Sequence, residues 1–241
     1  AASDVYKRQL AEGVKMFLEA PREQLQEVYV SESFLEKCSC REHLEEVGYE
    51  VVSDSVFSKI SDTCTPQGVL CVLKQFHYNI EEMLRDKAPL FLLLENIQDP
   101  GNLGTMLRTG EGAGVSGIIM SRDTVDLYNP KVIRSTMGSI YRVPFYYADD
   151  FAAAVHQVQR AGVSVYAAHL RGKNSYACQD YTKGTAFLIG NEGNGLREET
   201  AELADCYIRI PMEGKVESLN AAVASSILMY EAHRQRATIE K

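Results

Sequence analysis

The sequence has no apolar run that approaches the roughly 20 residues that a helix needs to cross a bilayer. No basic stretch followed by an apolar one opens the chain, so we expect no secretory signal peptide. Internal repeats and low-complexity segments are also missing. Together these absences predict a globular, cytoplasmic protein with no membrane partner.

The cysteine pattern lacks a metal-binding set. Of the six cysteines, only Cys38 and Cys40 lie close together in the sequence. A structural zinc site needs four ligands, and no second pair completes such a set. We therefore predict no metal, and we interpret the cysteines as reduced, mostly buried thiols of a cytosolic protein.

Positive charge is in deficit, with a formal net charge of −8 at pH 7, whereas nucleic-acid-binding proteins are usually basic. Residues 1–88 hold 10 Lys and Arg against 16 Asp and Glu, and residues 89–241 hold 15 against 17. The second part therefore has room for a local basic patch, with Lys131, Arg134 and Arg142 as its candidates. An ordinary solvated surface is an equally good interpretation of each of these side chains alone.

With 241 residues, 45% of them hydrophobic, the chain is long enough for one large or two small domains. Residues 1–77 alternate short helices, the first expected over 10–20, with short strands, which predicts a small α/β/α sandwich. Residues 78–89 are mostly polar and charged, as expected of a linker. Residues 90–241 open with an apolar run typical of a buried parallel strand, which predicts a second, parallel-sheet α/β domain.

Two strand-to-turn corners in the second domain point to a binding site. The apolar strand 186–189 runs straight into three glycines, at 190, 193 and 195, and glycine lets a backbone approach a ligand closely. A second short strand, 207–210, also ends in a turn. Because the carboxyl ends of parallel strands meet at one edge of a sheet, we expect a crevice there.

A glycine pattern at Gly112, Gly114 and Gly117 matches the dinucleotide-binding spacing, but its context is wrong. A dinucleotide loop follows a strand and opens a helix, whereas this stretch closes a helix that we expect Asn102 to cap. We interpret it as a helix C-terminus and turn. A nucleotide-binding enzyme of another class is therefore a weak alternative.

The last helix is predicted from Ser218, as its N-cap, to about Arg236. Its apolar residues repeat at helical spacing and form one stripe. We interpret that stripe as core rather than as a partner surface: Leu219, Val223, Ile227 and Tyr230.

Three polar, glycine-containing segments follow one another in the second domain. The first is Glu95–Gly104 followed by Arg108, the second is Ile189–Leu196, and the third is Ile210–Met212 followed by Ser218–Ala222. Together they resemble the signature motifs of the SpoU (TrmH) family of RNA ribose 2′-O-methyltransferases, in the SPOUT superfamily. Three motifs in order are far more specific than a single glycine motif.

The resemblance covers roughly residues 90 to 235. It implies a parallel-sheet domain that contains a deep trefoil knot, which periodicity alone would not reveal. It also implies that the α/β/α domain before it engages RNA, and that two copies pair through their terminal helices as a homodimer.

The cofactor implied by the resemblance is S-adenosylmethionine, held by backbone groups rather than by an acidic side chain. Gly190, Ile210 and Leu219 match the binding positions of the family. Neighbouring residues on the same loops and just after the strand ending at residue 167 are further candidates for the pocket: Asn191, Gly193, Met212, Ala168 and His169.

By resemblance, Arg108 lies nearest the 2′-hydroxyl and acts as general base. A guanidinium is effectively always protonated, so either the site depresses its pKa strongly, or Arg108 stabilises the forming alkoxide and holds a phosphate. The rest of the catalytic set that the motifs imply is Asn102, Glu192, Ser218 and Asn220. Without the motifs, each would be read as a helix cap or a solvated loop side chain.

The sequence thus predicts an S-adenosylmethionine-dependent enzyme that methylates a ribose 2′-hydroxyl in RNA. The N-terminal domain favours ribosomal RNA over transfer RNA. The alternatives are a transfer RNA enzyme and a non-catalytic RNA-binding module that has kept the fold.

Overall fold

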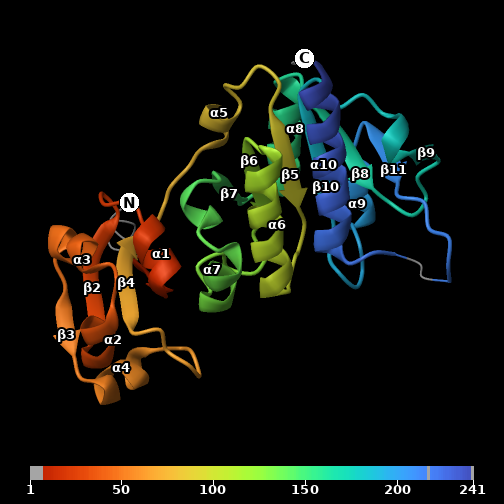
Figure 1. Ribbon diagram of the computed structural model, residues 1–241. Helices are drawn as coiled ribbons and strands as arrows, with labels where there is room; N and C mark the ends of the chain where they lie inside the picture. The colour runs from red at the N-terminus through yellow and green to blue at the C-terminus, as the bar shows by residue number, and fades with distance from the viewer. Residues whose placement is uncertain (1–7, 216–217, 240–241) are drawn as a thin grey trace. The chain divides into compact units, whose positions relative to one another are not determined.

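The computed structural model describes residues 8–215 and 218–239. The chain forms two compact units (Figure 1). One unit holds the chain up to Phe76 together with Leu127–Tyr141, and the other holds His77–Asp126 and the chain from Arg142 onward. The predicted linker, residues 78–89, falls in the second unit and contains the short helix α5 (Ile80–Met83).

The first unit is built on a four-stranded mixed sheet in the order β1-β4-β2-β3. Strand β4 is antiparallel to β1 and β2, and β2 is parallel to β3. Its strands are β1 (Arg8–Glu12), β2 (Leu25–Ser31), β3 (Glu50–Val52) and β4 (Val69–Lys74). Its helices are α1 (Val14–Glu19), α2 (Glu32–Lys37), α3 (Arg41–Val47), α4 (Asp54–Ile60), α7 (Pro130–Thr136) and the 3-10 turn η2 (Ser139–Tyr141).

The predicted helix over 10–20 is wrong in its first part, because residues 8–12 form strand β1. Gln9 and Ala11 are buried while Leu10 is 45% exposed, which is the two-residue alternation of a strand. Pairing with β4 decides the conformation, and helix α1 begins only after Gly13. A contact with a strand some 60 residues away in the sequence cannot be read from local spacing.

The second unit contains a seven-stranded sheet in the order β7-β6-β5-β10-β8-β11-β9, and all its described pairs are parallel. This confirms the predicted parallel α/β fold. The strands are β5 (Leu90–Leu94), β6 (Gly117–Ser121), β7 (Phe145–Ala148), β8 (Ser164–Ala168), β9 (Asn174–Ser175), β10 (Thr185–Ile189) and β11 (Cys206–Arg209).

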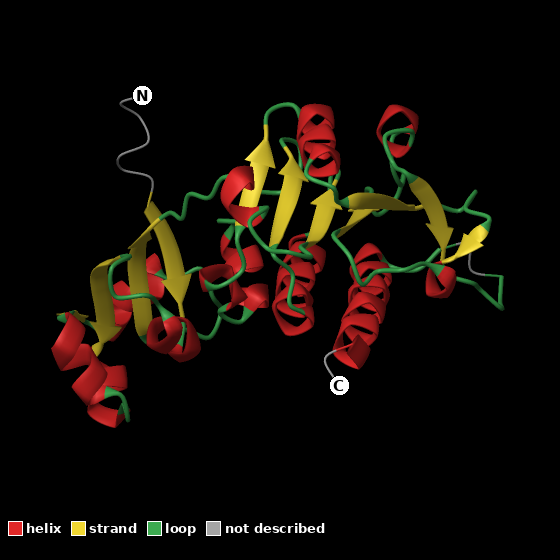
Figure 2. Ribbon diagram, turned by 90° about the horizontal axis from the view of Figure 1, so that it is seen from above, coloured by secondary structure: helices red, strands yellow, loops and turns green. Residues whose placement is uncertain are grey.

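Helices cover both faces of this sheet (Figure 2). Helices α6 (Pro100–Ala113) and α10 (Ala221–Ile239) pack together on one face, and α8 (Phe151–Arg160) covers the other. On the α8 side, Phe91 and Leu93 of β5 join Val155 and Val158 in one buried cluster. Burial on both faces explains why β5 and β10 are continuous apolar runs. The remaining short helices of this unit are α9 (Glu198–Ala201) and the 3-10 turn η3 (Tyr176–Cys178).

Strand β10 lies between β5 and β8, two strands that precede it in the chain. The second motif, which follows β10, therefore lies between two segments that come before it in the sequence. This strand order is consistent with the knotted fold that the resemblance implies, and the knot itself stays a prediction.

Helix α6 begins three residues earlier than predicted. Asp99, not Asn102, is its N-cap, because Asp99 Oδ1 accepts from the backbone N–H of Asn102 at 2.8 Å. Pro100 follows at the first helical position, where its missing N–H costs nothing. The side chain of Asn102 is therefore free to act elsewhere.

The prediction for the last helix is wrong in two respects. Its capping side chain is Asn220 rather than Ser218. Asn220 Oδ1 accepts from the backbone N–H groups of Ala222 and Val223, at 2.9 and 3.2 Å. In addition, Val223 and Tyr230 are 48% and 49% exposed, so the apolar stripe is not core. The face of α10 that is buried carries smaller or differently placed residues: Ala222, Ser225, Leu228, Met229 and Ala232.

Candidate functional site

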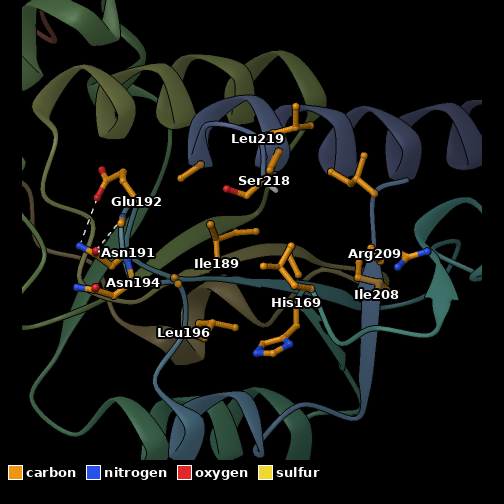
Figure 3. Close-up of a pocket in the computed structure, with 18 of the residues that line it drawn as sticks. His169, Ile189, Asn191, Glu192, Asn194, Leu196, Ile208, Arg209, Ser218 and Leu219 are labelled. Carbon is orange, nitrogen blue, oxygen red and sulfur yellow. Dashed lines mark hydrogen bonds between the residues drawn. The ribbon is translucent and has the colours of Figure 1, made fainter. Parts of the chain in front are cut away.

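A cavity of about 300 Å³ lies at the carboxyl ends of β8, β10 and β11. It is lined by the loops that follow these strands and by the start of α10 (Figure 3). Ligands bind at such edges in open parallel sheets, because the loops diverge there. Apolar side chains form much of its wall, among them Ile189, Leu196, Ile208 and Leu219.

All the residues that the sequence assigns to the cofactor line this cavity: Ala168, His169, Gly190, Asn191, Gly193, Ile210, Met212 and Leu219. Ser218, a predicted catalytic residue, lines it as well. The sequence reasoning missed several others, namely Leu170, Asn194, Leu196 and Arg209. These residues neighbour the motif positions on the same loops and strand ends, and no spacing rule separates them from ordinary loop residues.

The loop after β10 is a tight turn with its own hydrogen bonds. Asn191 and Gly195 exchange two backbone hydrogen bonds, at 3.0 and 2.9 Å. Asn191 Oδ1 accepts from the N–H groups of Gly193 and Asn194, both at 3.0 Å. A Cβ on residue 190 would lie 2.2 Å from the carbonyl carbon of Gly195, so position 190 must be glycine.

The carboxylate of Glu192 joins the second motif to the first. Oε1 accepts from the N–H of Asp99 and from Nδ2 of Asn102, both at 3.0 Å. Oε2 accepts from the N–H of Gln98 at 3.1 Å. Burial alone would raise the pKa of Glu192, but these hydrogen bonds outweigh burial and lower it. Glu192 is therefore ionised at neutral pH and holds the first motif as a fixed acceptor rather than as a proton carrier.

The same network extends to the third motif. Asn220 Nδ2 donates to Asn102 Oδ1 at 3.0 Å. Glu192, Asn102 and Asn220, three of the five predicted catalytic residues, are therefore directly connected. The connection orients their side chains before any ligand binds, which reduces the reorganisation needed during a reaction.

Arg108 stands apart from this network. It lies on the exposed side of α6, and in the described part of the chain it has no hydrogen-bond or ion-pair partner. It is also not among the residues that line the cavity. A single chain therefore does not bring Arg108 together with the other predicted catalytic residues.

An ionic cluster around the buried carboxylate of Glu95 lies beside the site, and the sequence reasoning missed it. Glu95, only 1% exposed, accepts from the backbone N–H of Arg197 at 2.8 Å and from its Nη1 at 3.3 Å. Arg197 also forms an ion pair with Asp123. Burial acts to raise the pKa of Asp123, but hydrogen bonds from Ser121 and Arg197 lower it overall. The cluster connects the ends of β5 and β6 to the start of α9.

His169 presents a neutral ring to the cavity. Its Nδ1 accepts from the backbone N–H of Arg171 at 3.1 Å, which places the proton of the neutral ring on Nε2. The ring stacks on Tyr207 with centroids 5.1 Å apart. Burial, and then the positive charge of Arg171, lower the pKa of His169. A flat, uncharged wall of this kind suits an aromatic ligand.

The remaining sequence candidates lie outside the cavity. Lys131 and Arg134 are on α7 in the first unit. Arg142, in the second unit, pairs with Glu111, with Nη2 and Oε2 3.1 Å apart, so its charge is offset locally. Within residues 8–215 and 218–239, no three His, Cys, Asp or Glu side chains gather as a metal site requires, and no helix is long and apolar enough to span a membrane.

The cavity fits the predicted cofactor by its size and its lining. About 300 Å³ is within the range of small-molecule sites. Isoleucine and leucine side chains and the ring of His169 can enclose an adenine, while the glycine-rich turn offers backbone groups to polar atoms. Among the described residues that line it, Glu192 is the only carboxylate, in keeping with recognition through the backbone.

Comparison with known proteins identifies the family. A model of the SpoU rRNA Methylase family matches residues 89–230. The 23S rRNA (guanosine(2553)-2′-O)-methyltransferase RlmP of Bacillus subtilis is 35% identical over 75% of this chain and 70% of its own length.

Two solved structures with bound AdoMet resemble the whole chain. The rRNA methyltransferase from Sinorhizobium meliloti has a TM-score of 0.80 and 32% identity over 94% of this chain and 87% of that one. The SpoU methyltransferase AviRb from Streptomyces viridochromogenes has a TM-score of 0.85 and 26% identity over 95% of this chain and 90% of that one. The predicted methyltransferase activity and its cofactor, S-adenosylmethionine, are thereby confirmed, and the chain belongs to the SpoU rRNA methylase family.

Proposed function

We propose that this chain methylates a ribose 2′-hydroxyl of ribosomal RNA. The observation that carries the proposal is the cavity lined by every predicted cofactor residue and joined to the network of Glu192, Asn102 and Asn220. Two of the relatives above are named as rRNA enzymes, and the likeness to one of them extends over 94% of this chain. Selectivity for RNA follows because only ribose carries a 2′-hydroxyl.

The cavity residues hold the cofactor, chiefly through backbone groups of Gly190, Ile210 and Leu219. S-adenosylmethionine, when bound, supplies an activated methyl group, so the protein mainly positions and polarises. Apolar side chains around it exclude water. Ser218 and the Asn102–Asn220 pair lie at or beside the cavity, where they orient the ribose.

The ribose oxygen that gains a methyl group must lose its proton, which passes to solvent water, and a cation stabilises the negative charge that develops on the oxygen. We assign the stabilisation of this charge to Arg108, whose guanidinium stays protonated. A positively charged donor close to the oxygen lowers the barrier because it is oriented before the reaction. Glu192 stays ionised and keeps the first motif in place.

Because Arg108 lies outside the cavity of its own chain, we propose that it serves the cavity of a second copy. The exposed face of the α6–α10 pair also carries two large apolar side chains. Tyr230 lies across Gly112, one turn beyond Arg108, since a Cβ on Gly112 would be 2.9 Å from Tyr230 Oη. Val223 and Tyr230 are each about half exposed. A homodimer formed through this face would bury both side chains and bring Arg108 to the partner.

Lys131 and Arg134 are the proposed contacts to RNA phosphates, and Arg142 contributes less because Glu111 offsets its charge. We also propose a cytoplasmic location. All six cysteines of the chain are free, including the half-buried Cys38 and Cys40, as is usual in a reducing compartment.

The test is the Arg108→Ala variant, assayed with deproteinised ribosomal RNA from cells that lack the gene. Methyl transfer is expected to fall by at least 100-fold, while S-adenosylmethionine binding measured by calorimetry stays unchanged. Full activity of the variant would reject the role of Arg108. Methylation of transfer RNA instead, found by mapping 2′-O-methyl positions with and without the gene, would overturn the substrate but keep the chemistry.

A further inference from the structure

An open depression adjoins the cofactor cavity and shares Asn191, Glu192 and Gly193 with it. Its remaining lining comes from the first and third motifs: Gln98, Asp99, Pro100, Asn102 and Asn220. If the proposed function holds, the target nucleotide must lie here, because its ribose oxygen has to reach the methyl donor next door. The polar atoms of the depression therefore bear on which nucleotide is accepted.

The depression is unsuited to a phosphate. None of its described lining residues is a lysine or arginine, and two, Asp99 and Glu192, are carboxylates. A phosphate would be repelled by these charges, and the Arg108 that the proposed second copy contributes is assigned to the ribose oxygen. The nucleotide must therefore present its neutral side, the sugar and the base.

Most polar atoms of the depression are already engaged within the protein. Asn102 donates to Glu192 and accepts from Asn220. Asn191 Oδ1 accepts from two backbone N–H groups of its own turn, and its Nδ2 donates to the carbonyl oxygen of Asn96 at 2.8 Å. These side chains shape the depression but have little capacity left to recognise a base.

Two side-chain oxygen atoms of the described lining residues remain available. Gln98 Nε2 donates to Asn96 Oδ1 at 2.6 Å and to the backbone carbonyl of Asp123 at 2.5 Å. A carbonyl can only accept, so the orientation of the amide is fixed and Gln98 offers only its Oε1. Asp99 uses Oδ1 to cap α6. In the described part of the chain, Gln98 Oε1 and Asp99 Oδ2 have no partner, and both side chains are exposed.

We propose that Gln98 and Asp99 read the base of the target nucleotide, and that they select guanine. Two acceptors from consecutive residues need a base edge with neighbouring donors. Among the four common RNA bases, only guanine presents two adjacent N–H donors, N1 and N2, on its Watson–Crick edge. Recognition of that edge in an unstacked base is a usual mode of RNA reading. The inference rests on the proposed function and adds the base to it.

Asp99→Asn is the sharpest test of this inference. Asparagine caps a helix as well as aspartate does, so Oδ1 still accepts from the N–H of Asn102 at the start of α6. The free carboxylate oxygen is replaced by an amide N–H2 group, a donor that would face the N–H donors of guanine. We expect kcat/KM for the ribosomal RNA to fall about 10- to 100-fold, with the affinity for S-adenosylmethionine unchanged. The matched control is Asp150→Asn, the same change at the cap of α8, which should leave both quantities unchanged.

A second measurement separates base reading from a general defect. Once the methylated nucleotide is mapped, an RNA fragment with inosine in its place lacks the N2 donor. The kcat/KM of wild-type protein should be about tenfold lower for the inosine fragment than for the guanosine one. The kcat/KM of Asp99→Asn should differ little between the two fragments. Equal losses for both proteins, or a mapped base other than guanine, would overturn the proposal. Failure of wild-type protein to methylate any RNA would instead reject the proposed function.

Discussion

At position 190 the chain has no space for a side chain. A Cβ there would lie 2.2 Å from both Gly195 C and Leu196 N. Both are backbone atoms, so neither can turn aside as a flexible side chain would. The close approach of two backbone segments forms one wall of the cavity, and this wall is lost if they separate.

We therefore expect Gly190→Ala to weaken S-adenosylmethionine binding at least tenfold, because the turn must open to admit a methyl group. Calorimetry measures the affinity, and thermal unfolding checks that the variant is folded. The comparison is Gly193→Ala on the same turn, where the nearest atom to a Cβ is Asn191 Oδ1 at an ordinary 3.6 Å. A similar loss in both variants would contradict the steric explanation.

Some Asp and Asn residues of the motifs cap helices and another connects the motifs, and the sequence does not specify which residue has which role. Asp99 and Asn220 cap α6 and α10, while Asn102 connects Glu192 to Asn220. The sequence singled out Asn102, Glu192 and Asn220 together, and the structure connects their side chains. The sequence assigned the two caps wrongly, because several neighbouring residues are chemically able to cap and only the path of the backbone decides between them.

At the scale of elements, one arginine of α10 forms hydrogen bonds with two segments that are distant in the sequence. Arg236 donates to four backbone carbonyls, those of Ala88, Pro89, Tyr181 and Lys183. Burial lowers the pKa of Arg236, and no carboxylate compensates among its described partners. Its contribution is to give a charged donor to carbonyls near the starts of β5 and β10. Those of Pro89, Tyr181 and Lys183 also accept from Thr185.

Replacing Arg236 with Leu is expected to destabilise the fold by about 2–4 kcal/mol, since several partly buried carbonyls lose a charged donor at once. Denaturant unfolding gives the free energy. Arg234→Leu on the same helix breaks an ion pair with Glu231 in which the arginine side chain is 65% exposed, and should cost about 1 kcal/mol or less. Equal effects would mean that the carbonyl contacts of Arg236 add nothing.

At the scale of the whole molecule, helices α6 and α10 run side by side in the same direction. Contacts between Asn102 and Asn220 and between Thr109 and Ser226 follow each other along the pair. The pair buries one face against the sheet and leaves the other exposed. That second face carries Arg108, and this arrangement is the reason for assigning one reaction site to two chains.

Mixing two defective variants tests this arrangement. Arg108→Ala lacks the cation, and Gly190→Ala binds S-adenosylmethionine at least tenfold more weakly, so its cavity is nearly empty at a cofactor concentration well below the dissociation constant of that variant. If each site combines the cavity of one chain with Arg108 of the other, half of the randomly mixed dimers contain one intact site. Activity should then recover to about a quarter of the wild-type value.

The control is a mixture of Arg108→Ala with Arg108→Gln, which should remain inactive because no chain supplies the cation. No recovery in the first mixture would mean that Arg108 and the cavity act within one chain. The mixed samples must be denatured and refolded together, so that subunits exchange.

The sequence by itself determined the family, the cofactor and the parallel α/β class. Three motifs at strand ends are local features, and apolar strands such as Leu90–Leu94 report their own burial. Tertiary structure decided the rest. It brought Glu192 to Asn102 across 90 residues, turned residues 8–12 into a strand, and left Arg108 outside the lining of its own cavity. Spacing along a chain specifies which side chains share a face locally, whereas contacts between distant segments depend on how the sheet orders its strands.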